Sequence, residues 1–421
     1  MPYSGRYFFN LYDLVDCITK AIDLINPEIS NHHQQVAYLA YHIAEQLHCP
    51  IEQLQTLVLA ALLHDIGALP SNDRLDFAEG DAVEDNHHAF VGAGLLAGFP
   101  RLKNIAEVVR FHHIPWKNGK GQFYHGRAVS PLSHILHLSD RISVQINRQQ
   151  NIISQVGRIK KNISEKRGTF FPPEAVDAFL AICDRESLWL GLTYQPGITN
   201  LPNSLALETI KLTLDDAVDL TKIFSYIIDF RSPFTAMHSA GVAAVAKKLA
   251  ELTGFSGDEC KMMSIAGHLH DIGKLVIPKR ILEKHGRLEP EEFDIIKSHS
   301  YYTYRLLSPI RGFEIITQWA AFHHERLDGH GYPFHLKANS LSLGSRIMAV
   351  ADIFTAITED RPYRKGMPEE EAKTVLAQMA ENGGISPRIL SLLLEHYQMI
   401  IGLRREAAET EAGDYRTILS C

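Results

Sequence analysis

The sequence HLHDIGKLVIPK, residues 268–279, places a histidine directly before an aspartate and has Lys274 three residues after that aspartate. A near copy, LLHDIGALPSND at residues 62–73, contains the same histidine–aspartate pair but has Ala68 at the position of the lysine. Imidazole and carboxylate groups are both ligands of divalent transition metals. Each copy is therefore a candidate part of a metal site, and the repeat indicates a duplicated segment.

Other histidines recur at the same spacing in the two halves of the chain. His32 lies 32 residues before the histidine of the first pair, and His238 lies 32 residues before that of the second. In each half a further histidine is followed 24 residues later by the first of two adjacent histidines. The segments around Asp140 and Asp352 are also similar. A repeat of this length predicts two copies of a whole domain rather than a solenoid of short units.

The apolar residues of the chain follow the spacing of amphipathic helices. Residues 32–47 and 238–252 each place apolar side chains on one helical face, with polar residues behind them. No segment alternates apolar and polar residues over a sustained length, so we expect no substantial sheet. We therefore predict an all-α protein with two tandem helical domains, residues 1–200 and 201–421, joined near the Pro- and Gly-rich residues 194–204.

Composition limits the classes of protein to which the chain can belong. Its 45% hydrophobic and 22% charged residues are typical of a globular protein, and its apolar runs are far shorter than the ~20 residues that span a bilayer. The net charge of −7 does not favour binding to a DNA or RNA polymer. Five scattered cysteines without CxxC spacing, and a start without signal-peptide features, predict a cytoplasmic protein. We expect the apolar-poor segment beyond about residue 405 to be mobile or bound to a partner.

The second copy contains a candidate cage for two metal ions, formed by histidine and aspartate without any cysteine. Its members are His238, His270, Asp271, His299, His323, His324 and Asp352. Such ligands suit Fe, Mn, Zn or Ni. We take Asp271 as the bridging ligand, because its two oxygens can each face one ion. Two neighbouring ions can hold a hydroxide between them and grip a phosphate on both sides of an in-line displacement.

The first copy has a residue of the same type at every one of these positions, and it is a candidate second metal site. The corresponding residues are His32, His64, Asp65, His88, His112, His113 and Asp140. Ala68 in place of the lysine therefore does not by itself mark a lost metal site.

Residues 235–400 closely resemble the HD-GYP phosphodiesterases, which belong to the HD superfamily of metal-dependent phosphohydrolases. The resemblance is carried by HDIGK at 270–274, HHERLDGHGYP at 323–333 and VADIFTAITEDRPYR at 350–364. It implies an all-helical bacterial enzyme that hydrolyses cyclic dinucleotides, chiefly cyclic di-GMP, at a site of two or three metals. Chains with an HD domain before the HD-GYP domain resemble a small bacterial group that acts on 3′,3′-cyclic GMP-AMP.

The resemblance also implies how the ions are held. His238, His270, Asp271 and Asp352 would bind one ion, and Asp271, His299, His323 and His324 would bind the other. Some members use a glutamate four residues before the first histidine to support a third ion, and Phe234 occupies that position here. We therefore predict a site for two ions.

Catalysis and substrate binding are assigned to a few further residues. We expect Asp271 and Lys274 to be catalytic, with Lys274 stabilising charge on the phosphate or protonating the leaving oxygen, although a solvated lysine is the alternative. The resemblance implies that Tyr332, Arg361 and Arg364 face the substrate. The glycines of DGHGYP predict a tight loop, and a purely structural role for this turn remains an alternative.

The first copy has no counterpart of the GYP or RPYR motif. We predict an HD domain that binds metal but lacks the cyclic dinucleotide grip and serves as a structural or regulatory partner. A second hydrolytic site, acting for example on a linear product, and a site without metal are the alternatives. We also expect contact between the two domains and leave a homodimer open.

Together these features predict a phosphodiesterase that opens 3′,3′-cyclic GMP-AMP, cyclic di-GMP or both to a linear dinucleotide, by attack of a metal-bridged hydroxide in the C-terminal domain. The alternatives are a non-catalytic cyclic dinucleotide sensor or scaffold, and a different nucleotide phosphohydrolase. Departures from the family pattern, such as PFHL at 333–336 and Thr355, leave the identity of the substrate open.

Overall fold

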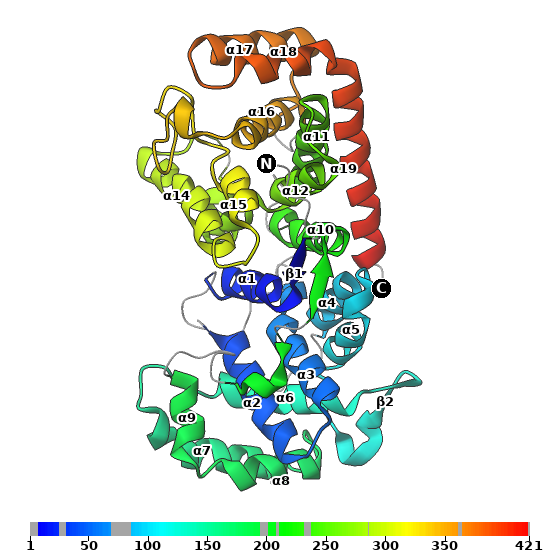
Figure 1. Cartoon of the computed structure of the whole chain (residues 1–421). Helices are drawn as coiled ribbons and strands as arrows, with labels where there is room; N and C mark the ends of the chain where they lie inside the picture. Colours follow the sequence, from blue (N-terminus) through cyan, green and yellow to red (C-terminus); the bar gives the residue numbers. More distant parts are fainter. Residues whose placement is uncertain are drawn as a thin grey trace. The chain divides into compact units, whose positions relative to one another are not determined.

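The protein is described from a computed structural model (Figure 1). The described residues are 7–24, 31–68, 86–193, 201–207, 210–230, 237–284, 286–360 and 364–419. Within these ranges the chain is mainly helical, and the strands are only two or three residues long. The prediction of an all-α protein is confirmed.

The chain divides into two compact units. The N-terminal unit is Ile22–Ile210, and the C-terminal unit combines Met1–Ala21 with Lys211–Ser420. The first residues group with the C-terminal unit because strand β1 (Phe8–Asn10) pairs antiparallel with strand β4 (Lys211–Thr213). This division differs from the predicted domains, residues 1–200 and 201–421. Most of the predicted linker, residues 194–204, lies outside the described residues.

The N-terminal unit consists of helices that follow α1 (Leu11–Asp23) along the chain. They are α2 (His32–Gln46), α3 (Ile51–Leu63), η2 (Ile66–Ala68), α4 (His87–Ala97), η3 (Pro100–Leu102), α5 (Lys103–Arg110), η4 (Lys117–Gln122), α6 (Pro131–Val144), α7 (Ile152–Glu165), α8 (Pro173–Ile182), α9 (Glu186–Thr193) and η6 (Asn203–Leu205). A short hairpin of β2 (Phe123–Tyr124) and β3 (Arg127–Ala128) follows η4.

The C-terminal unit repeats the same order of elements, and like the N-terminal unit it has three further α-helices after the repeated series. Its helices are α10 (Leu214–Phe230), α11 (His238–Leu252), α12 (Gly257–Leu269), η8 (Ile272–Val276), α13 (Lys279–Leu282), α14 (Pro290–Leu307), α15 (Glu314–Ala321), η9 (Ala338–Ser340), α16 (Leu343–Thr358), α17 (Glu369–Glu381), α18 (Pro387–Glu395) and α19 (Tyr397–Leu419). The series α2, α3, η2, α4, α5 and α6 corresponds to α11, α12, η8, α14, α15 and α16. The duplication seen in the sequence is thus present in the fold.

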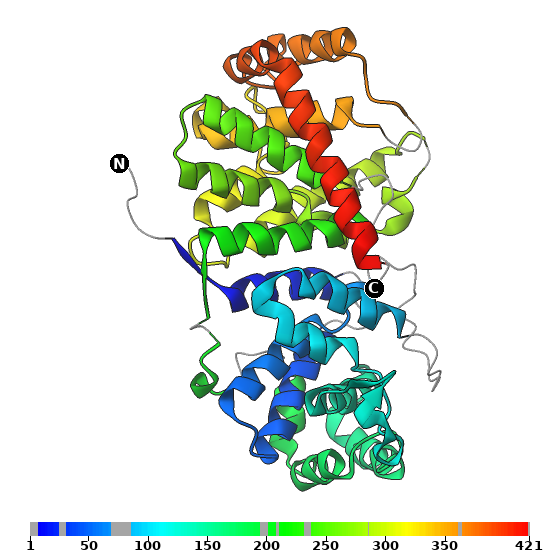
Figure 2. The same cartoon turned by 90° about the vertical axis from the view of Figure 1, so that its right-hand side faces the viewer.

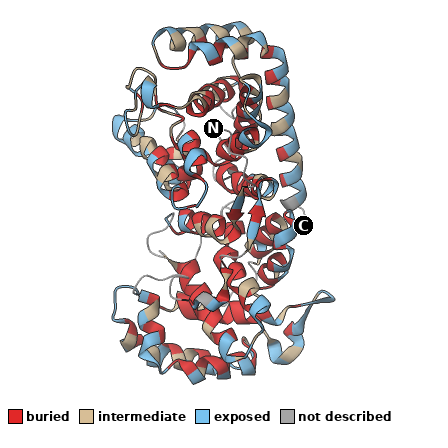
Figure 3. Ribbon diagram, in the orientation of Figure 1, coloured by how far each residue is buried: buried red, intermediate tan, exposed pale blue. Residues whose placement is uncertain are grey.

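Helices α11 and α12 form the centre of the C-terminal unit, where buried side chains concentrate (Figure 3). Helix α12 begins at a capping box, in which Ser256 and Glu259 satisfy free backbone N–H groups. The two helices approach closely at Gly267, where an added Cβ would lie 2.5 Å from the Cα atom of Ala243. A glycine is therefore needed at this crossing.

A glycine also fixes the turn that follows each histidine–aspartate pair. A Cβ atom on Gly273 would lie 2.0 Å from the carbonyl oxygen of His299 on α14. In the N-terminal unit a Cβ atom on Gly67 would lie 2.2 Å from the carbonyl oxygen of His88 on α4. The glycine of the HDIG sequence thus allows the turn to pack directly on the helix that carries the next histidine.

The end of the chain, which we expected to be mobile or bound to a partner, is helical. Helix α19 continues to Leu419, and Figures 1 and 2 show it running along the other helices of the C-terminal unit. Few of its residues beyond 405 are apolar, but Tyr415 and Glu411 are buried, and the Tyr415 ring packs near Tyr226 of α10. The buried residues Tyr397, Ile400, Arg404, Glu411 and Tyr415 recur at helical spacing and form one face of α19, part of which is polar. Among the described helices, none is both long enough and apolar enough to cross a membrane.

Two carboxyl groups, Glu411 of α19 and Asp229 of α10, are buried in the C-terminal unit. Glu411 Oε1 accepts a hydrogen bond of 2.9 Å from the Ser225 hydroxyl, and Asp229 accepts bonds of 2.7 and 2.8 Å from Ser239. Burial raises the pKa of Glu411, and the charge of Asp229 raises it further. The folded protein therefore holds a proton that the unfolded chain releases near its ordinary carboxyl pKa.

This proton predicts how stability depends on pH. Because the folded-state pKa is raised, the contribution of Glu411 is fully present below the ordinary carboxyl pKa and is lost as the pH rises toward the folded value. Glu411→Gln keeps the neutral form at every pH, so its melting temperature relative to the wild type should rise between pH 5 and pH 8. Thermal unfolding at both pH values measures this, with the exposed Glu409→Gln on the same helix as control. A constant difference across the two pH values would contradict it.

Candidate metal centre

The candidate ligands of the C-terminal unit come from five elements that converge in its core. His238 begins α11, the histidine–aspartate pair follows α12, His299 lies in α14, the paired histidines follow α15, and Asp352 lies in α16. All of them except His324 are buried. Residues separated by more than 100 positions are therefore brought into one cage.

Three of the histidines are oriented by backbone carbonyl groups. Each donates its Nδ1–H to the carbonyl three residues earlier: His270 to Gly267 (2.8 Å), His299 to Ile296 (2.6 Å) and His323 to Ala320 (2.6 Å). A carbonyl oxygen can only accept, so the proton lies on Nδ1 and Nε2 is the ring nitrogen that carries the lone pair. This is the usual arrangement of a metal-binding histidine.

Asp271 lies between two groups of imidazoles. Its Oδ2 atom is 3.2 Å from His270 Nε2. Its Oδ1 atom is 3.5 Å from His299 Nε2 and 3.9 Å from His323 Nε2. The two oxygens of one carboxylate therefore face different histidines, as a bridging ligand requires.

Asp352 completes the first of these groups. Its Oδ1 atom is 3.1 Å from His238 Nε2 and 3.8 Å from His270 Nε2. The ligand atoms of His238, His270 and Asp352 all lie within 4.8 Å of one another, and so do those of His299, His323 and His324. The second group is linked to Asp352 through His324 Nδ1, which lies 3.9 Å from the Oδ2 atom.

Some buried nitrogen and oxygen atoms of this cage have no hydrogen-bond partner, and a bound cation would compensate for this. His270 Nε2 and Asp271 Oδ1 are buried and have no hydrogen-bond partner among the described residues. Burial lowers the pKa of His299 to about 3, so its ring is neutral near pH 7 and able to bind metal. Burial alone would raise the pKa of Asp271, but His270 and Lys274 hold it well below its usual range. Nitrogen and oxygen donors in this arrangement fit divalent transition metals.

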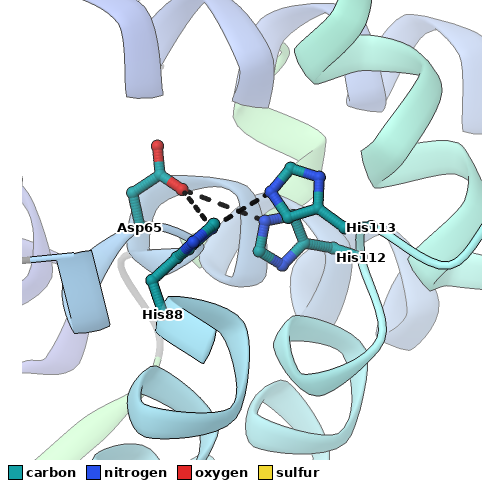
Figure 4. A group of neighbouring side chains, drawn as sticks. All are labelled: Asp65, His88, His112 and His113. Atoms are coloured by element: carbon teal, nitrogen blue, oxygen red, sulfur yellow. Dashed lines mark hydrogen bonds and ion pairs between the residues drawn. The ribbon is translucent and has the colours of Figure 1, made fainter. Parts of the chain in front are cut away.

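The N-terminal unit contains a cage of the same form (Figure 4). Asp65 Oδ1 lies 3.4 Å from His88 Nε2 and 3.9 Å from His112 Nε2. His88 Nε2 lies 3.0 Å from His113 Nε2. The ligand atoms of these four residues all lie within 4.8 Å of one another.

The remaining predicted ligands of the N-terminal unit form the second half of that cage. His64 Nε2 lies 3.1 Å from Asp65 Oδ2, and His32 Nε2 lies 3.3 Å from Asp140 Oδ1. One difference from the other unit is Arg141, which pairs with Asp140 Oδ2 at 2.8 Å. All seven predicted positions are thus brought together in each unit.

Comparison with known proteins agrees with this duplicated cage. Models of the HD domain match residues 29–145 and residues 222–389. The chain is a tandem HD-domain protein. We refer below to the N-terminal and C-terminal HD domains.

Relatives extend over different parts of the chain. A 3′3′-cGAMP-specific phosphodiesterase of Vibrio cholerae is 28% identical over 419 residues, covering 96% of this chain and 95% of that protein. A cyclic di-GMP phosphodiesterase of Pseudomonas aeruginosa is 39% identical over 158 residues, which is 37% of each chain. The crystal structure of a cyclic GMP-AMP-specific phosphodiesterase of V. cholerae matches with a TM-score of 0.65 and 22% identity, covering 93% of this chain and 98% of that one. The structural likeness supports the fold.

The residues predicted to act in catalysis or substrate binding differ in whether they contact the C-terminal cage. Lys274 Nζ is 2.5 Å from Asp271 Oδ2, and its side chain is partly exposed. The Tyr332 ring is mostly buried, with its centroid 4.9 Å from that of His324. The Arg364 guanidinium donates to the carbonyl oxygen of Ala356 at 2.6 Å, so it contacts the backbone of α16. Arg361 and Phe234 lie outside the described residues.

Two glutamates support the cage and were not predicted from the sequence. Glu359 Oε2 lies 3.0 Å from His238 Nδ1. Burial opposes protonation of His238, but Glu359 and then Asp352 outweigh it and raise its pKa to about 10. Glu325 is buried and accepts the backbone N–H groups of Phe334 and Leu336 at 2.7 and 2.8 Å, which fixes the loop after GYP.

Both glutamates carried some signal in the sequence. Glu325 follows the paired histidines directly, and Glu359 lies seven residues after Asp352, about two helical turns away.

The glycines of the DGHGYP stretch form a tight loop, as predicted. Gly329 has a positive φ of 82°, and a Cβ atom on Gly331 would lie 2.4 Å from the backbone nitrogen of Arg326.

The contact of Glu359 with His238 predicts a role in metal affinity. Glu359→Gln removes the charge that orients and polarises His238, so the C-terminal HD domain should bind its metal about 10-fold or more weakly. Competition with a coloured chelator measures this affinity. Glu381→Gln, at an exposed position on α17, is the control. Equal affinities of the Glu359→Gln and Glu381→Gln proteins would rule out this role.

Proposed function

We propose that the C-terminal HD domain hydrolyses a cyclic dinucleotide, 3′,3′-cyclic GMP-AMP or cyclic di-GMP, to a linear dinucleotide at a site of two divalent metal ions. The observation that carries this proposal is the position of Asp271, whose two oxygens face separate groups of histidines. A carboxylate in this position suits two neighbouring ions, and paired ions are typical of phosphodiester hydrolysis. No ligand position is lost, so a non-catalytic sensor is not favoured.

The relatives support this substrate class. The V. cholerae protein that matches along nearly the whole chain is named as specific for 3′3′-cGAMP. The P. aeruginosa protein that matches over a shorter part is named for cyclic di-GMP. Because the longer match includes both HD domains, we favour 3′,3′-cyclic GMP-AMP.

The described residues around the cage have separable tasks in this reaction. Bound divalent ions would supply an activated water and an electrophilic grip on the phosphate. Asp271 and the histidines would hold those ions. Lys274, at 2.5 Å from Asp271 Oδ2, would bring a positive charge to the developing charge on the phosphate or protonate the leaving oxygen. Tyr332, next to His324, would offer a ring face to a base.

The N-terminal HD domain has the cage without the substrate loop. Its sequence contains neither GYP nor RPYR, and Ala68 replaces the lysine. We propose that this domain binds metal but does not open the cyclic dinucleotide.

A comparison of two matched variants tests the proposed function. Asp271→Asn removes a bridging charge in the C-terminal HD domain and should lower hydrolysis by about 1,000-fold or more, which corresponds to about 4 kcal/mol. Asp65→Asn makes the same change in the N-terminal HD domain and should leave most of the activity. The measurement is chromatography of products from cyclic di-GMP, cyclic di-AMP and 3′,3′-cyclic GMP-AMP with Fe, Mn, Zn or Ni. If the wild type cleaves none of them, the proposed activity is wrong, and equal losses in both variants would overturn the assignment to one domain.

The proximity of Lys274 to the cage predicts a separate effect on the rate. Lys274→Ala gives the C-terminal HD domain the residue that the N-terminal domain has naturally. The expected loss in kcat is about 100-fold, with metal content unchanged because Lys274 donates no lone pair to a metal when protonated. Steady-state kinetics and metal analysis of the same preparation check both statements. A variant with full kcat would show that Lys274 is only a solvated side chain.

A further inference from the structure

A buried histidine that has no counterpart in the C-terminal HD domain lies beside the cage of the N-terminal HD domain. His33 follows His32 at the start of α2 and is fully buried, with 0% exposure. Its ligand atom and those of His64 and Asp65 all lie within 4.8 Å of one another. The His33 and His64 ring centroids are 5.1 Å apart. His33 is therefore close enough to share an ion with these residues.

A carboxylate orients the His33 ring. The Nδ1 atom of His33 lies 2.5 Å from Oδ1 of Asp23, the last residue of α1. With Nδ1 occupied by this contact, Nε2 is the ring nitrogen that remains available. That atom is buried and has no hydrogen-bond partner among the described residues. A histidine held by a carboxylate at one nitrogen and bound to metal at the other is a common arrangement in metal sites.

The corresponding position in the C-terminal HD domain has a different chemistry. The offset of 206 residues that relates His32 to His238 places Ser239 at the position of His33 and Asp229 at that of Asp23. There the serine hydroxyl donates to Asp229 Oδ1 at 2.7 Å, and its backbone N–H donates to Oδ2 at 2.8 Å. The aspartate is thus satisfied within the protein, and no imidazole is present to bind metal.

The two domains also differ on the bridging aspartate itself. In the C-terminal HD domain Lys274 pairs with Asp271 Oδ2, whereas Ala68 at the corresponding position has no charge to offer Asp65. The C-terminal cage thus has a lysine ammonium group beside it, and the N-terminal cage has the imidazole of His33.

We propose that His33 is an additional metal ligand of the N-terminal HD domain and that Asp23 positions it. Its imidazole suits an ion such as Zn²⁺, Ni²⁺ or Fe²⁺. Catalytic metal sites keep a coordination position open for water or substrate, whereas structural sites fill it with protein ligands. The additional ligand gives the N-terminal site a structural character. This proposal does not depend on the activity of the C-terminal HD domain.

The full chain with Asp271→Asn, His299→Ala and Asp352→Asn provides the background for a test, because these changes remove a ligand from each half of the C-terminal cage. The protein is stripped of metal and titrated with Co²⁺, whose visible absorption reports on the ligands and whose affinity is measured by chelator competition. His33→Ser, which introduces the residue of the other domain, should weaken Co²⁺ binding by at least about 10-fold and change the absorption spectrum. His48→Asn is the control, because His48 is exposed and its positive φ of 58° suits asparagine.

A second variant protects the test against misfolding. Circular dichroism of the metal-free proteins shows whether His33→Ser keeps its helices. If it does not, Asp23→Asn takes its place, since it leaves His33 present but removes the charge that orients the ring, and the affinity should again fall about 10-fold. The proposal is overturned if the background protein binds no Co²⁺. It is also overturned if the folded variant that is tested binds Co²⁺ with the affinity and spectrum of the background protein.

Discussion

A buried carboxylate that faces imidazoles on two sides is the constraint on which each HD domain depends. Removing such a charge from water is costly unless cations or hydrogen-bond donors compensate for it. In the C-terminal domain Asp271 is compensated by His270 and by Lys274, and its second oxygen faces further histidines. The helices must therefore converge at this point, and the rest of the domain is arranged to allow it.

The convergence relies on glycine at the turn after each histidine–aspartate pair. Gly67 and Gly273 let this turn lie against the helix that carries the next histidine, at distances that leave no room for a Cβ atom. Backbone carbonyls in the last turns of α3 and α12, just before these turns, fix the imidazole rings of His64 and His270. Secondary structure and ligand orientation are thus produced by the same short segments, which explains why the sequence HDIG occurs in both domains.

The sequence was sufficient to predict the helical fold, the duplication and the positions of the cage residues, because spacing along the chain is visible without coordinates. It did not reveal Glu359, since a supporting carboxylate has no fixed spacing from the histidine that it holds. It also did not distinguish His33 from an ordinary core histidine, because its role depends on Asp23 and His64 being close in space. The helical order of α19 beyond residue 405 was missed for a related reason: a polar residue, Glu411, continues the buried face that Tyr397 and Ile400 begin, and apolar content alone does not reveal it.

The pairing of β1 with β4 makes the C-terminal unit discontinuous in sequence, with residues 22–210 inserted between its first strand and the next. During synthesis the ribosome releases β1 first, but its partner strand emerges only after the whole N-terminal unit has been made. Domains generally fold as they emerge, so the N-terminal unit can form its cage while β1 still lacks its partner. The chain thus sets an order of assembly in which the duplicated domain with the substrate loop is completed last.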